Sequence, residues 1–287
     1  MHPLSFVLLG FAPGLFWLWM VVRSNRQRPD PVALVLRTFL LGAVVALPIV
    51  FVGRVVGGEV SIRPGMSAGE AAFIAFVIAG LIEELGKFLV VRLSLYDSPY
   101  FDEPLRGMVY SGAVALGFAS LENVLYMLED GPEVLVVRGL TATLGHVFFS
   151  ALWGYGLGAD RRAKLRGEPS RGYAALGLFG ALAAHGLYDF GLFTGDVSLA
   201  LVVLVVCGAA SVRMLVIANR TSMHAGRTAA PFVECARCRA PSAVRARFCS
   251  ACGVAHVRGL ERRCGGCKAP LLDDPSYCPG CGVRVAS

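Results

Sequence analysis

Seven long apolar segments follow one another along this chain and constrain its fold more than any other feature. They cover residues 4–22, 32–53, 70–92, 107–128, 134–158, 172–193 and 197–217. Each is about long enough to cross ~30 Å of hydrocarbon at ~1.5 Å per helical residue. One such segment could be a buried core helix, but seven in a chain with 55% hydrophobic and 16% charged residues are too apolar for a soluble domain. The sequence therefore predicts an all-α polytopic membrane bundle of seven transmembrane helices.

The basic residues behind the net charge of +7 lie mostly in connections beside the segment ends, where they orient a membrane protein rather than bind nucleic acid. With an odd number of spans, three basic groups fall on one side. They are Arg23, Arg26 and Arg28; Arg161, Arg162, Lys164, Arg166 and Arg171; and Arg213 and Arg220. The first segment lacks the basic region and cleavage site of a secretory signal, so we expect it to be a span. We expect a multi-pass protein of the cell membrane with its N-terminus outside and its C-terminus in the cytoplasm.

Eight of the nine cysteines form two copies of one pattern near the C-terminus. Ten residues separate Cys235-x2-Cys238 from Cys249-x2-Cys252, and ten separate Cys264-x2-Cys267 from Cys278-x2-Cys281. Two such pairs can close tetrahedrally on one Zn2+ with four thiolates, and a cytoplasmic location argues against disulfides. The pattern predicts two structural zinc sites and resembles the double zinc ribbon found at the ends of many prokaryotic proteins. The ninth cysteine, Cys207, lies in the last segment and is expected to serve packing.

These features divide the chain into three parts. We expect a transmembrane helical domain at 1–217, a polar linker at 218–234 and a cytoplasmic double zinc ribbon at 235–287. A module this small depends on its metal for folding, and a site closed by four thiolates has no open position for catalysis. We therefore expect the ribbons to bind a protein partner. Their arginines favour a solvated basic face over contact with nucleic acid or anionic lipid.

Ionisable residues inside the apolar segments are few. Glu83, Glu84 and Lys87 lie in the third segment. A charged group at membrane depth costs about 3 kcal/mol and rarely occurs there without a function. The remaining polar residues are Glu122 followed by Asn123, His146 with Ser150 four residues on, and His185 with Asp189 four residues on. A step of four residues keeps two side chains on one face of a helix, so His185 and Asp189 are expected to point the same way.

The depths of these residues agree. Counted from the cytoplasmic segment ends at ~1.5 Å per residue, Glu83 lies roughly 14 Å deep, Glu122 about 22 Å, His146 about 18 Å and His185 about 20 Å. Taken singly, a histidine could be an interhelical hydrogen-bonding residue and Lys87 could reach back to the membrane surface. Because four helices bring carboxylates and two imidazoles to one level, we expect a shared site. One glutamate with two histidines is the ligand type of a catalytic zinc that keeps a position for water.

Four motifs in successive segments resemble those of PrsW-family intramembrane proteases, in a superfamily with CAAX prenyl endopeptidases and bacteriocin-processing proteins. The resemblance covers roughly residues 70–193. The motifs are Glu83-Glu84-x-x-Lys87; Gly117-Phe118-x-x-x-Glu122-Asn123; His146-x-x-Phe149-Ser150, with Trp153-Gly154-x-Gly156 after it; and His185-Gly186-x-Tyr188-Asp189. The zinc ribbons lie outside this pattern.

The resemblance implies cleavage of peptide bonds within or beside the membrane, in membrane-associated proteins such as anti-sigma factors. Glu83 and Glu84 would be the catalytic carboxylates, at least one of them activating water, and Lys87 would keep one of them ionised. Glu122, His146 and His185 would bind a metal ion, a catalytic zinc, or orient the water. Asp189 would fix the tautomer of His185 from behind. A metal-free glutamate mechanism stays open.

Two further readings remain at this point. A non-enzymatic membrane sensor or scaffold would use the zinc ribbons to recruit a cytoplasmic partner. An ion or proton transporter is less favoured because no repeat of broken helices is visible. If the chain is a protease, water must reach the site, and we expect a polar cavity open to the cytoplasm.

Overall fold

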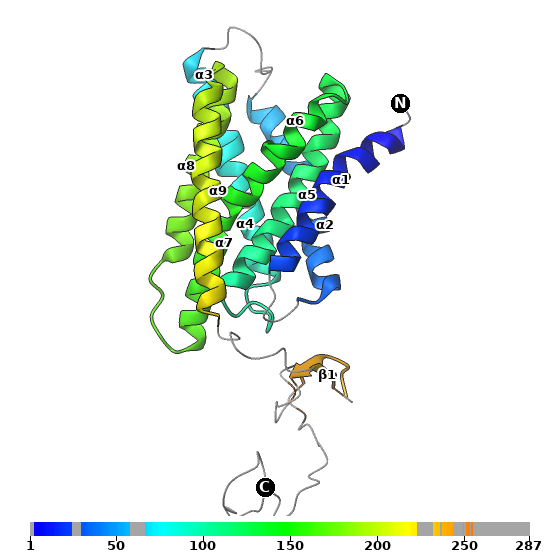
Figure 1. The fold of residues 1–287 in the computed structure, drawn as a ribbon, viewed down its shortest axis with the longest axis vertical. Coiled ribbons are helices and arrows are strands. Elements are labelled where there is room, and N and C mark those ends of the chain that lie inside the picture. The colour runs from blue at the N-terminus through cyan, green and yellow to red at the C-terminus, as the bar shows by residue number, and fades with distance from the viewer. Residues whose placement is uncertain are drawn as a thin grey trace, which may run out of the picture. The chain divides into compact units, whose positions relative to one another are not determined.

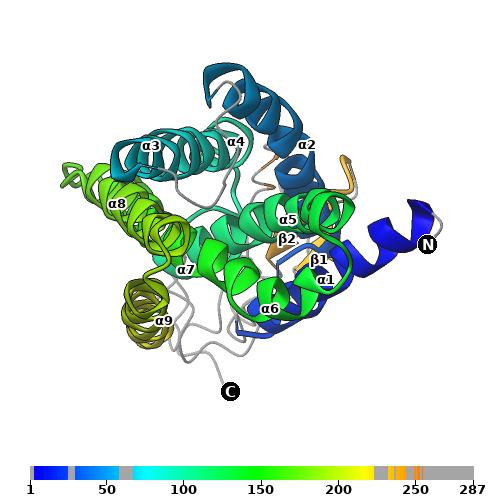
Figure 2. The same cartoon turned by 90° about the horizontal axis from the view of Figure 1, so that it is seen from above.

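A long buried helix, α5 (Pro104–Asp130), forms the centre of the larger of the two units into which the chain divides (Figures 1 and 2). The computed structural model describes residues 3–24, 30–57, 67–222, 232–235, 237–243, 249, 251–252 and 254. The units are Met1–Ala229 and Ala230–Ser287. In the first, α5 packs against α1 (Pro3–Ser24), α2 (Val32–Gly57) and α7 (Ala142–Leu165).

Small residues explain why α5 can be buried on all sides. A Cβ added at Gly107 would collide with the carbonyl of Gly154 on α7, and one added at Gly117 would collide with the carbonyl of Phe39 on α2. Helices that pack without a hydrophobic driving force rely on such close backbone approach. The concentration of glycine and alanine in this segment thus positions three neighbours around one axis.

The other helices surround this centre. In chain order they are α3 (Ala68–Phe73), the π-helical segment η1 (Ile74–Glu83), α4 (Glu84–Ser94), α6 (Val134–Leu140), α8 (Tyr173–Thr194) and α9 (Val197–Arg220). Their outward side chains are apolar: Phe51 is 68% exposed, Phe179 73% and Val205 68%. An apolar exterior over a bundle with a polar interior is the arrangement expected in lipid.

Six helical segments among the described residues are long and apolar enough to cross a membrane. They are Leu4–Arg23, Val32–Gly53, Pro104–Asp130, Val134–Leu165, Tyr173–Thr194 and Val197–Arg220. The expected third span differs from these because α3, η1 and α4 follow one another as three short pieces from Ala68 to Ser94. The all-helical membrane fold is confirmed, with six candidate spans among the described residues where seven were expected; one of the six, Val134–Leu165, comprises both α6 and α7.

The π-helical segment η1 ends at the first glutamate of the pair. Its ten residues pack closely on α8: a Cβ at Gly186 would collide with the ring of Phe76, and one at Gly80 would lie 2.7 Å from the carbonyl oxygen of Leu182. π-helical turns are rare and occur often at functional sites. Here the segment turns into α4 at the point where Glu83 and Glu84 enter the bundle.

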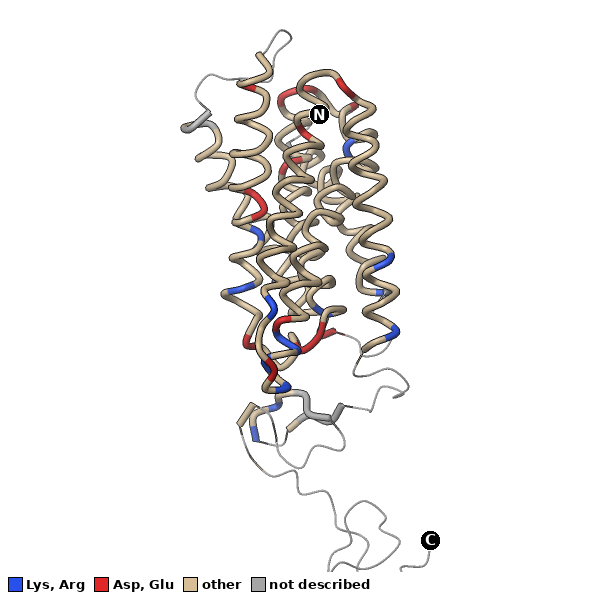
Figure 3. Tube along the Cα trace, turned by 90° about the vertical axis from the view of Figure 1, so that its left-hand side faces the viewer, with Lys and Arg blue, Asp and Glu red and all other residues tan. Residues whose placement is uncertain are grey.

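The two ends of the helical unit differ in charge. Lysine and arginine gather at the end that holds the α7–α8 connection and the last turn of α9, toward the bottom of Figure 3. We call this the basic end, defined by Arg161, Arg162, Lys164 and Arg220. The opposite end, which holds the C-terminus of α5 and the start of α7, we call the α6 end.

The second unit contains a short antiparallel pair of strands among its described residues. Strand β1 (Phe232–Glu234) pairs with β2 (Pro241–Ala243), with Val233 opposite Ser242. Helix α9 runs to Arg220 and β1 begins at Phe232, so regular structure enters both edges of the expected linker at 218–234. The second cysteine pattern, at 264–281, lies outside the described residues.

Candidate active site

The adjacent glutamates and Lys87 form a buried ion-pair cluster at the junction of η1 and α4. The Lys87 ammonium donates to Glu83 Oε2 at 3.1 Å and to Glu84 Oε1 at 3.0 Å. The side chains of Lys87 and Glu84 are 0% exposed, whereas that of Glu83 is 11% exposed. Buried charges are tolerated only when they are paired and their hydrogen bonds are satisfied. The partners of each carboxylate therefore indicate whether it is held in place or is available to react.

Glu84 is enclosed by donors. The hydroxyl of Ser150 and the indole nitrogen of Trp153 donate to its Oε2 at 2.8 and 2.9 Å. Its Oε1 accepts from Lys87 and lies 3.2 Å from Nδ1 of His185. Four donors around one buried carboxylate hold its orientation and leave it poorly placed to meet a substrate.

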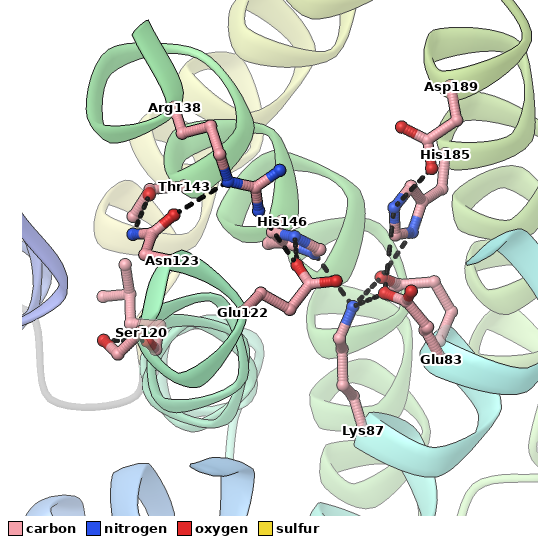
Figure 4. Close-up of polar contacts among 12 residues, drawn as sticks. Glu83, Lys87, Ser120, Glu122, Asn123, Arg138, Thr143, His146, His185 and Asp189 are labelled. Atoms are coloured by element: carbon pink, nitrogen blue, oxygen red, sulfur yellow. Dashed lines mark hydrogen bonds and ion pairs between the residues drawn. The ribbon is translucent and has the colours of Figure 1, made fainter. Parts of the chain in front are cut away.

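His146 on α7 lies between a lysine and a carboxylate. Its Nδ1 is 2.9 Å from the Lys87 ammonium and its Nε2 is 2.8 Å from Glu122 Oε2 (Figure 4). Because an ammonium group can only donate and a carboxylate can only accept, we assign the proton to Nε2 and the lone pair to Nδ1. The Nδ1 lone pair then accepts from the Lys87 ammonium.

His185 on α8 faces carboxylates with both nitrogens. Its Nδ1 donates to Glu84, which leaves Nε2 toward Glu83 at 3.9 Å and Asp189 at 3.5 Å. Phe149 stacks on the ring at a centroid distance of 5.1 Å. The partner that fixes the tautomer in this geometry is Glu84, whereas Asp189, which we expected in that role, lies beside the opposite nitrogen.

Glu83, His146 and His185 form a group that could hold a metal ion. One ligand atom from each lies within 4.8 Å of the others, and all three residues are buried. The donor set fits a metal: one carboxylate and two imidazoles from three helices leave a coordination position for water or substrate. The sequence led us to expect Glu122, rather than Glu83, as the carboxylate ligand beside the two histidines. Glu122 instead lies on the far side of the His146 ring, where its carboxylate contacts Nε2 and Arg138.

The site is closed on one side and partly exposed on the other. Glu84, Ser150 and Trp153, which lie toward the basic end, are fully buried. On the α6 side the side chains of Glu122 and Asp189 retain 12% and 17% exposure. Residual exposure therefore increases toward the α6 end, away from the basic residues.

Arg138 is the contact residue that sequence reasoning missed. It was not among the expected site residues, yet its guanidinium donates to Glu122 and Asn123. The available signal was a lone arginine inside the apolar segment 134–158, eight residues before His146. Thr143, which accepts a hydrogen bond from Asn123 at 3.0 Å, carried no signal of its own.

The second unit brings four cysteines together. Cys235, Cys238, Cys249 and Cys252 all place Sγ within 4.8 Å of one another. The separations are 3.7 Å for Cys235–Cys252 and 3.6 Å for Cys238–Cys249. Zn–S bonds of about 2.3 Å in a tetrahedron separate sulfurs by about 3.8 Å, whereas a disulfide needs about 2.05 Å. The backbone N–H of Cys238, helped by that of Arg237, lowers the pKa of Cys235 to about 6, which favours the thiolate needed for metal binding.

The fold and the membrane site together define a class: a polytopic membrane enzyme whose carboxylates and imidazoles can activate water inside a helical bundle. The sequence matches the PrsW family of intramembrane metalloproteases over residues 30–215, and the chain belongs to this family. The matched segment contains every residue of the membrane site and ends before the eight cysteines of the two C-terminal patterns.

Curated relatives agree with this assignment, and each is named Protease PrsW. The protein of Geobacillus kaustophilus is 37% identical over 186 residues, covering 65% of this chain and 79% of the relative. That of Bacillus subtilis is 33% identical over 187 residues, covering 65% and 82%. That of Clostridioides difficile is 28% identical over 193 residues, covering 65% and 79%. No solved structure gives a significant match.

The chain is therefore an intramembrane protease, a multi-pass membrane protein that acts in the bilayer on membrane-associated substrates. This confirms the predicted family and activity. The alternative of a non-catalytic scaffold receives no support.

Proposed function

We propose that Glu83 is the carboxylate that activates water for peptide-bond hydrolysis and that Glu84 is its structural partner. The observation that carries this assignment is the convergence of Glu83, His146 and His185 within 4.8 Å in the bundle. Of the two glutamates, only Glu83 belongs to this group and retains exposure. Glu84, held by four donors, positions Lys87 and His185.

The chemistry of the step follows from these positions. Glu83 takes a proton from the attacking water and returns it to the leaving amine nitrogen, as a general base and then a general acid. Its Oε2 faces Lys87 and His185, so we assign Oε1 to this proton transfer. His146 and His185, with Glu83, would hold the metal ion. A bound ion would supply Lewis-acid polarisation of the scissile carbonyl or of the water.

The test is cleavage of single-pass membrane reporter proteins, tagged at both ends and co-expressed with the protein. Wild-type chain should produce two tagged fragments, whereas Glu83→Gln should produce none while inserting in the membrane at the same level. A Glu83→Gln variant that cleaves at the wild-type rate would refute the assignment. Leu93→Gln, at a 79% exposed position one residue before the end of α4, is the matched control and should cleave normally.

We also propose that the basic end is cytoplasmic and that water and substrate reach the site from the opposite, α6 end. The distribution of arginine and lysine supports the orientation. The exposure of Glu122 and Asp189 supports entry from the α6 end. This end is opposite to the cytoplasmic side, on which we expected the polar cavity to open. Alkaline phosphatase fused after residue 195 should be active and a green fluorescent protein fused after residue 222 should fluoresce. The reverse pattern would overturn the orientation.

For the second unit we propose a structural zinc held by Cys235, Cys238, Cys249 and Cys252, and a second at Cys264, Cys267, Cys278 and Cys281. The sulfur separations support the first, and the repeated spacing supports the second. Because four thiolates leave no open position, the role of these sites is to fold a module that binds a protein partner. Purified protein should contain two thiolate-bound zinc ions per chain, and serine substitution within either pattern should remove one.

A further inference from the structure

Helix α6 carries its charged residue inward and its apolar residues outward. Val136, Val137 and Leu140 are 73%, 65% and 63% exposed, whereas the side chain of Arg138 is 15% exposed. The indole of Trp17 on α1 donates to the carbonyl of Gly139 at 3.1 Å, which fixes α6 against the bundle. A charged side chain turned into a membrane protein requires partners there.

Arg138 finds these partners on one face of α5. Its Nε donates to Asn123 Oδ1 at 3.1 Å, its Nη2 donates to Glu122 Oε2 at 3.3 Å, and its guanidinium carbon lies 3.7 Å from the ring centroid of Tyr126. Asn123 is held in turn by Thr143 on α7. The planar guanidinium therefore joins α6 to the two helices that carry Glu122 and His146 (Figure 4).

Glu122 passes this constraint to His146. The same oxygen, Oε2, accepts from Arg138 and from Nε2 of His146. A carboxylate behind a metal-binding or catalytic histidine fixes both the tautomer and the ring orientation. With the proton held on Nε2, the Nδ1 lone pair faces Lys87, the ammonium that also bonds Glu83 and Glu84.

We propose that Arg138 is a positioning residue of the active site, which acts through Glu122 to hold His146 with Nδ1 directed at the reacting centre. This inference rests on the proposed function of His146. It adds α6, a helix without a recognised motif residue, to the machinery of the site. It also explains why an arginine stands in this apolar segment.

A double-mutant cycle on the full-length protein tests the proposal. The variants are Arg138→Met, Glu122→Met and the pair, with the cleavage rate at saturating reporter and the melting temperature measured for each. Arg138→Met alone should slow cleavage about 10- to 100-fold, the usual effect of removing such a supporting contact. In the Glu122→Met background the same change should slow it less than about threefold, because Arg138 acts only through Glu122.

Two further variants separate positioning from charge and from folding. Lysine keeps the charge but lacks the rigid fork of N–H groups, so Arg138→Lys should remain slower than wild type. Arg161→Met is the matched control, since Arg161 is a partly buried arginine paired with Asp97 at 3.2 Å at the basic end. It should cleave at the wild-type rate. A high enzyme concentration and long incubation, still at saturating reporter, keep slow variants measurable.

The outcomes discriminate. Wild-type cleavage by Arg138→Met or Arg138→Lys would overturn the inference, as would an equal loss in both backgrounds of the cycle. A loss accompanied by a lowered melting temperature and matched by Arg161→Met would also overturn it. If Glu122→Met and His146→Gln both cleave normally, the proposed site itself fails, which is distinguishable from failure of Arg138 alone.

Discussion

Two groups in this protein could hold a metal ion, and they are built in opposite ways. The cysteine group draws four sulfurs from Cys235 to Cys252, a separation of 17 residues, around tight turns. The membrane group draws Glu83, His146 and His185 from three helices and up to 102 positions apart. The first offers four equal donors and no open position, which suits a structural site. The second offers three mixed donors and leaves a place for water, which suits catalysis.

The same contrast recurs between the adjacent glutamates. Glu84 is saturated with donors and faces the basic end, whereas Glu83, one residue earlier, retains exposure. Complete burial among hydrogen-bond donors therefore distinguishes the structural glutamate from the reactive one, even though the two are adjacent in the sequence. Four variants test these two comparisons.

The largest effect is expected for Glu83→Gln. Loss of the proton acceptor should slow cleavage about a thousandfold, within the range of general-base contributions. The melting temperature should change little because Lys87 keeps its bond to Glu84. Reporter cleavage and thermal unfolding in detergent measure the two quantities. If Glu83→Gln lost folded protein to the same extent as cleavage, Glu83 would be a structural residue like Glu84, which would contradict the proposed division of roles.

Glu84→Gln should act first on stability. Removing one partner of a buried ion pair costs about 3 kcal/mol or more, and the new amide group would face donors on both sides. We expect a lower melting temperature than for Glu83→Gln, with reduced cleavage that follows the loss of folded protein. A Glu84→Gln protein with wild-type stability would contradict the structural role of Glu84.

Ser150→Ala removes one of the four donors to Glu84. The hydroxyl is buried and its hydrogen bond is 2.8 Å long, so its loss should cost about 1–2 kcal/mol of unfolding free energy. Cleavage should fall by less than tenfold. Ser94→Ala is the control, since that hydroxyl bonds only its own helix at the carbonyl of Val90. A larger loss of unfolding free energy in Ser94→Ala than in Ser150→Ala would contradict the role of the four donors around Glu84.

The smallest effect on cleavage is expected from Cys235→Ser combined with Cys252→Ser. This change should remove about one zinc per chain, because two thiolates cannot complete a tetrahedral site. Metal analysis of the purified protein measures the loss. Cleavage of the membrane reporter should change less than about threefold. A loss of cleavage comparable to that of Glu83→Gln would show that the two metal-capable groups are functionally coupled.

The sequence predicted much of the membrane site because ionisable residues are energetically unfavourable inside a membrane and therefore stand out in apolar segments. Glu83, Lys87, His146 and His185 were recognisable as ionisable groups in apolar segments at similar depth. Their pairing was not predictable: whether Glu83 or Glu122 joins the histidines depends on which side of the His146 ring each reaches. Arg138 was not predictable as a site residue because its inward direction depends on how α6 packs.

The sequence by itself determined that this protein is a helical membrane protein, that four segments bring carboxylates and imidazoles to one level, and that the cysteines fall into fourfold sets. These properties follow from composition and short-range spacing, which do not depend on how helices pack. Only the tertiary structure decided that Glu84 is closed and Glu83 open, and that Glu122 stands behind His146. Those distinctions depend on how the helices pack, for example at Gly107 and Gly186, where an added Cβ would collide with the neighbouring helix.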